Sequence, residues 1–150
     1  MLGDIRVNSS VRTVFGPHLC GDSALDVRNN EILTGSWRYD KQLQVWDIGS
    51  GQEIKDIPMC RNPGLKSSML YAAQFSKSDS EGRFIAAGGS NPHEISIFDS
   101  KNNYTQIGSV ANLPNGVFSV DFSPSRSCLA AAGGLGPVVF IDVNPETLAI

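Results

Sequence analysis

The feature that most constrains the fold of this 150-residue chain is a pattern of short strands that occurs three times. Short apolar runs alternate with turn-forming Gly, Pro, Asn, Asp and Ser residues, without the longer apolar periodicity of helices. An aspartate ends the third run of each unit, and these residues, 52 and then 43 positions apart, are Asp47, Asp99 and Asp142. Four short runs separated by turns predict a four-stranded antiparallel meander in each unit.

Several of the predicted strands are apolar at consecutive positions and do not alternate between apolar and polar. The clearest example is Val138-Val139-Phe140-Ile141 in the third unit. A strand of this kind suits a sheet that is covered on both faces, so each sheet is expected to have a neighbour on either side. Repeats of about 40 to 50 residues that stack in this way are typical of the blades of a β-propeller.

The first unit carries a more specific signature in three places. Gly16-Pro17-His18 resembles the Gly-His that opens a WD repeat, Leu33-Thr34-Gly35-Ser36 resembles its second strand, and residues 40–47 resemble its turn, third strand and closing Trp-Asp. The chain is therefore similar to the WD40-repeat β-propeller family over residues 11–150. The second and third units match mainly through position and through repeated Phe-Ser, Ala-Gly-Gly and Phe-Asp or Ile-Asp sequences.

The resemblance implies a buried hydrogen-bond network in the first unit. In the family, a tryptophan N–H donates to a strand hydroxyl, which bonds to a histidine and through it to a turn aspartate. The matching residues here are His18, Thr34 or Ser36, Asp40 and Trp46. Such a network satisfies each buried polar group and makes the blade rigid. Phe98 and Ile141 replace the tryptophan in the other two units, which are therefore expected to rely on packing.

The predicted fold is all-β: a WD40-type β-propeller with three four-stranded antiparallel blades that form an incomplete propeller. The expected blade units are residues 16–57, 65–110 and 113–150, and residues 10–15 are expected to be the outer strand of a preceding blade. Closed propellers have about 4 to 8 blades. We therefore expect the chain to be a fragment of a longer propeller protein, or else to need other copies or another chain to supply the remaining blades.

Composition and charge argue against several other classes of protein. The net charge is −3 and the basic residues are scattered, unlike the clustered basic face of a nucleic-acid-binding protein. No apolar run approaches the roughly 20 residues that span a bilayer. The three cysteines have no close spacing, which is typical of a reducing compartment. We expect an intracellular protein of the cytoplasm or nucleus, without nucleic-acid or membrane partners.

The sequence contains no recognisable catalytic or cofactor-binding constellation. It has only two histidines, His18 and His93, and the pair His18 and Cys20 has no second pair at the spacing of a zinc site. The glycine-rich segment Gly133-Gly134-Leu135-Gly136 leads into a strand and not into a helix, which argues against a phosphate-binding loop. We expect no enzyme activity, no metal and no cofactor.

The turn Trp37-Arg38-Tyr39 is the strongest candidate for partner binding, because Trp, Tyr and Arg are enriched at binding hot spots. The resemblance places this turn on the top face of the propeller. The other candidates on that face are Arg61, Lys66, His93 and Asn115. Arg38, Arg61 and Lys66 would together form a cationic spot for an acidic or phosphorylated peptide. The alternative is that Trp37 packs back onto the neighbouring blade and that the charged loops are simply solvated.

These observations predict a non-catalytic scaffold that mediates protein–protein interactions within a larger assembly. Two other functions stay open at this point. One is an enzyme that uses the propeller as its scaffold, with an active site partly in missing blades. The other is a purely architectural subunit that packs into a complex through its blade edges. The fold alone does not decide between them.

Overall fold

The structure is a computed structural model, and it describes residues 2–4, 6, 9–59, 68–78, 81–134, 136 and 138–144. Within these residues nearly all regular structure is β-strand. The two helical turns present there are the 3-10 segments η1 (Asp22–Ala24) and η2 (Ser100–Asn102). The all-β class predicted from the sequence is confirmed.

Eleven of the strands form three antiparallel sheets, which we call blades 1, 2 and 3. Blade 1 contains, in spatial order, β3 (Leu25–Arg28), β4 (Glu31–Gly35), β5 (Leu43–Asp47) and β6 (Glu53–Ile57). Blade 2 contains β7 (Met69–Phe75), β8 (Phe84–Ser90), β9 (Ile95–Asp99) and β10 (Thr105–Val110). Blade 3 contains β11 (Val117–Phe122), β12 (Cys128–Gly133) and β13 (Val139–Asp142).

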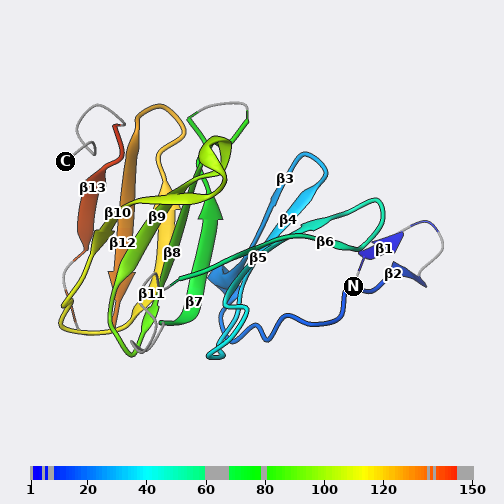
Figure 1. Cartoon of the computed structure of the whole chain (residues 1–150), viewed down its shortest axis with the longest axis horizontal. Coiled ribbons are helices and arrows are strands. Elements are labelled where there is room, and N and C mark those ends of the chain that lie inside the picture. The colour runs from blue at the N-terminus through cyan, green and yellow to red at the C-terminus, as the bar shows by residue number, and fades with distance from the viewer. Residues whose placement is uncertain are drawn as a thin grey trace.

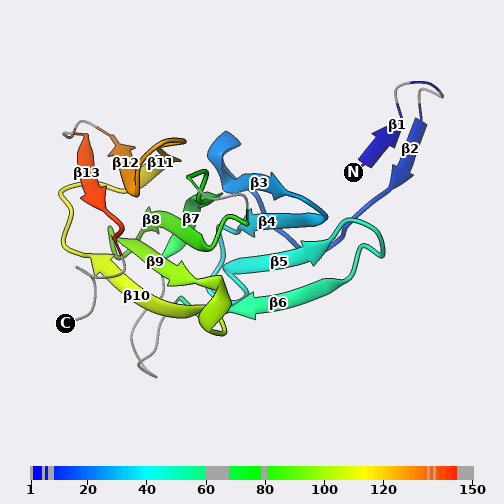
Figure 2. The ribbon, with the colours of Figure 1, turned by 90° about the horizontal axis from the view of Figure 1, so that it is seen from above.

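The blades stack face to face in chain order. Blade 2 lies between the other two, with blade 3 on one side of it and blade 1 on the other (Figure 1). Seen from above, the first strands β3, β7 and β11 lie along one side, and the fourth strands β6 and β10 lie along the opposite side (Figure 2). We therefore call β3, β7 and β11 the inner strands, and we call the face that a blade turns toward the next blade its front face.

The local sequence explains the turn between the first two strands of blade 1. Blade 1 turns from β3 to β4 through Asn29 and Asn30, and Asn29 has a φ of 50°. Asparagine tolerates this left-handed conformation better than most residues, so a two-residue hairpin turn forms here. The register of the hairpin puts Asp26 and Leu33 on the front face of blade 1 and Val27 and Ile32 on its back face.

The hydrophobic core lies between blades, which explains why the strands are apolar on consecutive residues. One buried cluster fills the space between blades 1 and 2, and its large members are Leu33, Leu43, Val45, Ile57, Met59, Leu70, Phe75, Ile85 and Phe98. A second cluster fills the space between blades 2 and 3, and its large members are Phe84, Ile95, Ile97, Val117, Val120, Phe122, Leu129 and Val143. Blade 2 thus contributes side chains to both clusters and is covered on both faces.

Glycines in the second strands allow the next blade to approach closely. A Cβ atom added to Gly35 would lie 3.1 Å from the Ala73 Cβ, and one added to Gly88 would lie 2.5 Å from the Val117 Cγ1. Gly35 and Gly88 occupy equivalent positions in blades 1 and 2. The repeated glycine in the sequence therefore marks a packing requirement at each interface between blades.

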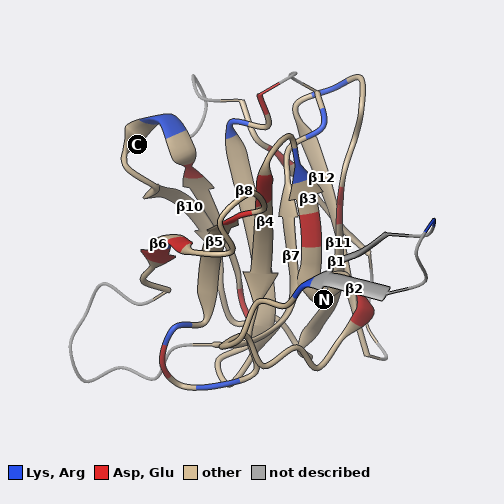
Figure 3. Ribbon diagram, turned by 90° about the vertical axis from the view of Figure 1, so that its right-hand side faces the viewer, with Lys and Arg blue, Asp and Glu red and all other residues tan. Residues whose placement is uncertain are grey.

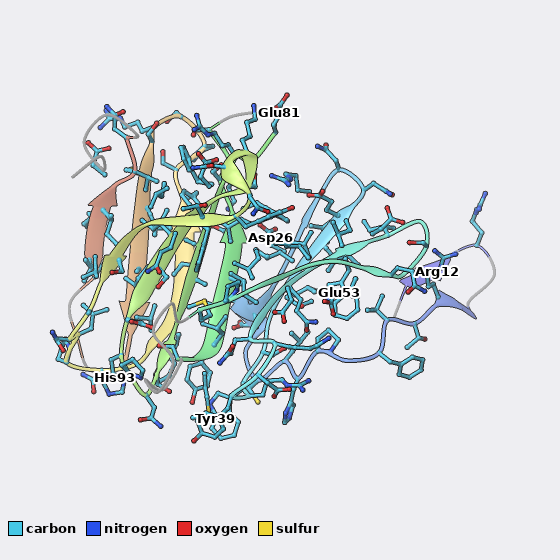
Figure 4. The ribbon with its side chains drawn as sticks, in the orientation of Figure 1. Arg12, Asp26, Tyr39, Glu53, Glu81 and His93 are labelled. Atoms are coloured by element: carbon cyan, nitrogen blue, oxygen red, sulfur yellow. The ribbon has the colours of Figure 1, made fainter. Side chains whose placement is uncertain are left out.

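The inner strands are also tied to one another by a repeated hydrogen bond. In blade 1 the Asp26 Oδ2 accepts from the Phe75 N–H of blade 2 at 2.8 Å. In blade 2 the Gln74 Oε1 accepts from the Phe122 N–H of blade 3, also at 2.8 Å. Asp26 lies between β3 and β7 in Figure 4. We call this contact the inter-blade latch: a side-chain acceptor on one inner strand binds a main-chain N–H of the next inner strand.

The predicted four strands are present in blades 1 and 2. Blade 3 has three strands among the described residues, and the fourth strand expected at residues 147–150 lies outside them. The strand expected at residues 10–15 overlaps β2 (Ser9–Arg12), which pairs with β1 (Leu2–Asp4) in a separate two-stranded sheet. The blade limits 16–57, 65–110 and 113–150 stay predictions, because residues 60–67 and 145–150 are not described.

Candidate functional site

The candidate site lies on the face formed by the turns between the second and third strands of each blade, which we call the top face. It runs along the lower edge of Figure 4, where Tyr39 and His93 are labelled, whereas Glu81 lies at the opposite end. The β4–β5 turn contributes Trp37, Arg38 and Tyr39, and the β8–β9 turn contributes His93.

Three aromatic rings from three different blades form a continuous row near this face. The Trp37 Nε1 donates to the Tyr71 hydroxyl at 2.9 Å, and the two ring centroids are 6.5 Å apart. Tyr71 in turn meets Phe118 edge-to-face, with centroids 4.9 Å apart and ring planes at 84°. Edge-to-face pairs of this kind are favourable beyond the area that they bury. We call Trp37, Tyr71 and Phe118 the aromatic row.

The position of Trp37 combines the two alternatives that its sequence left open. Its ring contacts Tyr71 of the neighbouring blade, yet the residue keeps 38% of its surface exposed. Tyr39 is still more exposed, and Phe118 is also an exposed large apolar side chain. The top face and the adjoining inner strands thus present apolar aromatic surface that is held in place by packing.

Arg38 is engaged within its own turn. Its Nε and Nη2 donate to the two carboxylate oxygens of Asp40 at 2.9 and 2.6 Å, and its Nη1 donates to the Gly16 carbonyl at 3.1 Å. Hydrogen bonding to Arg38 lowers the pKa of Asp40, and the same bonds raise the pKa of Arg38. The cationic spot expected at Arg38 is therefore compensated by an adjacent carboxylate. Arg61 and Lys66 lie outside the described residues.

His93 and Asn115 are half-buried on the same face. The His93 carbonyl accepts from the Leu113 N–H at 3.2 Å, while its Nδ1 is buried and has no hydrogen-bond partner among the described residues. Asn115 lines an apolar hollow between blades 2 and 3, of about 360 Å³ including the solvent-side opening. Ala131 and Ala132 also line this hollow.

The residues expected to form the buried network are only partly brought together. The Trp46 Nε1 donates to the Thr34 hydroxyl at 2.9 Å, and both side chains are buried. The Thr34 hydroxyl in turn donates to the Gln44 carbonyl at 3.4 Å. Ser36 is buried too, but its hydroxyl accepts from the main-chain N–H of His18 at 3.1 Å.

The structure does not place the His18 imidazole and Asp40 in this network. His18 is exposed, and it takes part through its main chain, with its carbonyl accepting from the Trp37 N–H at 2.9 Å. Asp40 is exposed as well, because Arg38 lies two residues before it in the same turn and binds its carboxylate. The physical reason for the difference is this local ion pair, which engages the aspartate at the surface.

Sequence reasoning did not single out Tyr71 and Phe118. Both lie in predicted strands, where an aromatic residue ordinarily belongs to the core. Each lies where its inner strand pairs irregularly with the second strand, because the register shifts around Tyr71 and around Phe118. Such an irregularity re-aims a side chain that regular alternation would turn toward a neighbouring blade, and the strand pattern of the sequence does not reveal it.

Other kinds of site receive no support from the described residues. They contain no group of three or more His, Cys, Asp or Glu side chains placed to hold a metal ion. None of their helices has the length and apolar character needed to cross a membrane. Viewed from the side of blade 1, acidic and basic residues are interspersed, mainly in turns and at strand ends (Figure 3).

Comparison with known proteins identifies the fold. No family model matches the sequence, and no curated protein matches it either. Among solved structures, the chain is similar to one described as "Structure of U3-55K", with a TM-score of 0.70 and 20% sequence identity. It is also similar to one described as "Crystal structure of RRP9 WD40 repeats", with a TM-score of 0.69 and 18% identity.

Each of these matches covers 88% of this chain and 38% of the solved chain. The chain therefore spans well under half the length of these structural neighbours. At such low identity the similarity establishes the fold and nothing finer. The fold is that of a partial WD40 β-propeller, as the resemblance in the first unit predicted.

Proposed function

We propose that this chain is a non-catalytic scaffold that binds other proteins through its top face. The observation that carries the proposal is the aromatic row, in which Trp37, Tyr71 and Phe118 join three blades into one partly exposed surface. An exposed apolar surface of contiguous aromatic side chains is typical of a protein interaction site. The WD40 fold is compatible with this function but does not by itself establish it.

The support for the site is geometric as well as compositional. Tyr71 and Phe118 project from inner strands that pair with β8 and β12 on both sides of each residue. Trp37 is fixed by its bond to the Tyr71 hydroxyl. Binding residues on such rigid elements lose little conformational entropy when a partner docks.

The partner that fits this surface best is an extended peptide segment or loop with apolar side chains that lie on the rings. The preference for an acidic or phosphorylated segment belongs to the same proposal. It depends on Arg38, since an incoming anion would compete with Asp40 for the guanidinium. Tyr39, His93 and Asn115 are the proposed contributors to specificity around this surface, and the roles of Arg61 and Lys66 stay predictions from the sequence.

The proposal is tested by comparing proteins captured by immobilised wild-type chain and by a variant with Trp37→Ala, Tyr39→Ala and Phe118→Ala. We expect the proteins captured by the wild type to be lost from the variant. Phe15→Ala is the matched control, because Phe15 is a highly exposed aromatic residue outside the row. Equal capture by wild type and triple variant, with both folded by circular dichroism, would show that the site is wrongly assigned.

A further inference from the structure

The apolar hollow between blades 2 and 3 is built from two adjoining blades of this chain. Ile95 of β9 and Ala131 of β12 line it, and both belong to the buried cluster that joins the two blades. Leu113 and Asn115, from the segment that connects β10 to β11, line it as well. The hollow therefore lies where the covered faces of blades 2 and 3 meet the segment that links them, and Asn115 brings it to the top face.

The glycine-rich segment that follows β12 contributes to the lining of the hollow. Gly133 and Gly134 have no positive φ, so their backbone conformation does not itself require glycine. A Cβ atom added to Gly133 would lie 2.0 Å from the Gly116 carbonyl oxygen, so close packing of main chain against main chain explains that glycine. A Cβ atom added to Gly134 would lie 3.3 Å from the Phe118 ring. The glycines of this segment therefore allow close approach and leave space, and they do not form a tight turn.

Asn115 supplies a polar group at the hollow. Its side chain has no hydrogen-bond partner within the described part of the chain. A Cβ atom added to Gly136 would lie 3.8 Å from the Asn115 Nδ2 and 3.9 Å from the Pro114 Cγ, so a longer side chain at position 136 would narrow the hollow. A side-chain amide carries both donors and an acceptor. It can therefore pair with the N–H and C=O groups of a peptide main chain.

The hollow is continuous with the aromatic row. Cβ atoms added to Gly116 and Gly134, which both line the hollow, would lie 3.4 and 3.3 Å from the Cε1 and Cε2 atoms of Phe118. The Phe118 ring thus borders the hollow, and it meets the Tyr71 ring edge-to-face. One extended segment that lies on the aromatic row can therefore also reach the hollow.

The size and lining of the hollow suit a small aliphatic side chain. The part that the centre of a water molecule can occupy is about 50 Å³. One water needs about 10 to 15 Å³ of such space, so about three to four waters fit, with a total volume of about 90 to 120 Å³. This volume matches a four-carbon aliphatic side chain better than an aromatic ring. Among the described residues that line the hollow, Asn115 is the one with a polar side chain, so a charged group would be buried there without an ionic partner.

We propose that this hollow is a pocket for one branched aliphatic side chain of an extended segment of a partner protein. The pocket rests on the function proposed above, and it adds the kind of residue that the partner must carry. A leucine, isoleucine or valine side chain fills the hollow, while the Asn115 amide binds the main chain of the segment beside it. The neighbouring apolar side chains of the segment lie on Phe118 and Tyr71.

A probe that carries one leucine side chain between two peptide groups, N-acetyl-leucine-N′-methylamide, tests the pocket directly. We expect its titration into the protein to shift the NMR signals of the Ala131 and Ala132 methyl groups to saturation. N-acetyl-glycine-N′-methylamide has the same peptide groups without the side chain and should bind at least tenfold more weakly. The phenylalanine analogue should also bind more weakly than the leucine probe. Equal binding of the leucine and glycine probes, or shifts that never saturate, would overturn the proposal.

Two substitutions with matched controls locate the binding of the leucine probe. Gly136→Leu, which narrows the hollow, should weaken binding at least tenfold, whereas Gly49→Leu in an exposed turn of blade 1 should leave it unchanged. Asn115→Ala removes the contact to the main chain and should weaken binding about three- to tenfold. Asn102→Ala, in η2 at the other end of β9, should have no effect. Circular dichroism verifies that each variant is folded.

Capture of proteins by the immobilised chain separates this pocket from the binding surface as a whole. We expect Gly136→Leu to capture at least tenfold less than wild type or Gly49→Leu. If capture is lost in the variant with Trp37→Ala, Tyr39→Ala and Phe118→Ala but is unchanged in Gly136→Leu, the binding surface stands and the pocket is refuted. Capture that this triple variant retains refutes the binding surface itself, whatever the titration with the leucine probe shows.

Discussion

The bond between Trp46 and Thr34 allows a quantitative test of how blade 1 is stabilised. In Thr34→Val a methyl group of nearly the same size replaces the hydroxyl, so no cavity forms, but the buried Trp46 N–H loses its acceptor at 2.9 Å. An unsatisfied buried donor costs about 1 to 3 kcal/mol. The second contact of the hydroxyl, at 3.4 Å to the Gln44 carbonyl, is long and should add little.

This loss converts to a measurable change in thermal stability. For a domain of about 150 residues, 1 kcal/mol corresponds to about 2 to 4 °C in Tm, so Thr34→Val should lower the Tm by about 2 to 12 °C. Thr34→Ser keeps the hydroxyl and loses one methyl group, which costs about 1 kcal/mol. Thermal unfolding followed by circular dichroism compares the two. A Tm unchanged in the valine variant, or lower in the serine variant than in the valine variant, would refute the reasoning.

Three further predictions concern the packing and pairing of the blades. Asp26→Ala should lower the free energy of unfolding, measured by urea denaturation, by about 1 to 3 kcal/mol, because it removes the 2.8 Å bond to the Phe75 N–H. Asp26→Asn should lower this free energy less, since it keeps an acceptor. By the same measurement, Gly88→Ala should lower the free energy of unfolding by about 1 to 3 kcal/mol, because the added Cβ would lie 2.5 Å from the Val117 Cγ1. Gly49→Ala, in an exposed turn, should lower it less. Arg83 donates two hydrogen bonds to Asp99, which lowers the pKa of Asp99. The resulting stability is present above the ordinary aspartate pKa of about 3.9 and is lost as the pH falls through the lower folded value, so Arg83→Met should flatten the pH dependence of unfolding below about pH 4.

The sequence predicted those parts of the fold that depend on local pattern. The consecutive apolar residues of the strands indicated sheets covered on both faces, and buried Val45 and Ile97 lie at such interfaces. The Ala-Gly-Gly sequence that the second and third units share supported their match, and its Gly88 proves to be a point of close approach to the next blade. These features could be predicted because each follows from burial in a repeated geometry.

The details of the candidate site depend on competition between neighbours, which a motif does not reveal. Asp40 matched the family pattern, but Arg38 in the same turn binds it at the surface. Tyr71 and Phe118 lie far apart in the sequence and meet only because their blades stack. The latch was hidden for a similar reason: Asp26 and Gln74 are different residue types, and only the three-dimensional register shows that they serve the same purpose.

The latch also limits how the sheets can move against each other. Successive residues along a strand are about 3.3 Å apart, so sliding one inner strand past the next by one residue would carry the Phe122 N–H out of hydrogen-bonding reach of Gln74. Sliding of one inner strand past the next is therefore opposed by a directional bond as well as by packing. Relative motion of the sheets should instead take the form of small rocking about the inner strands, with the outer strands β6 and β10 moving furthest.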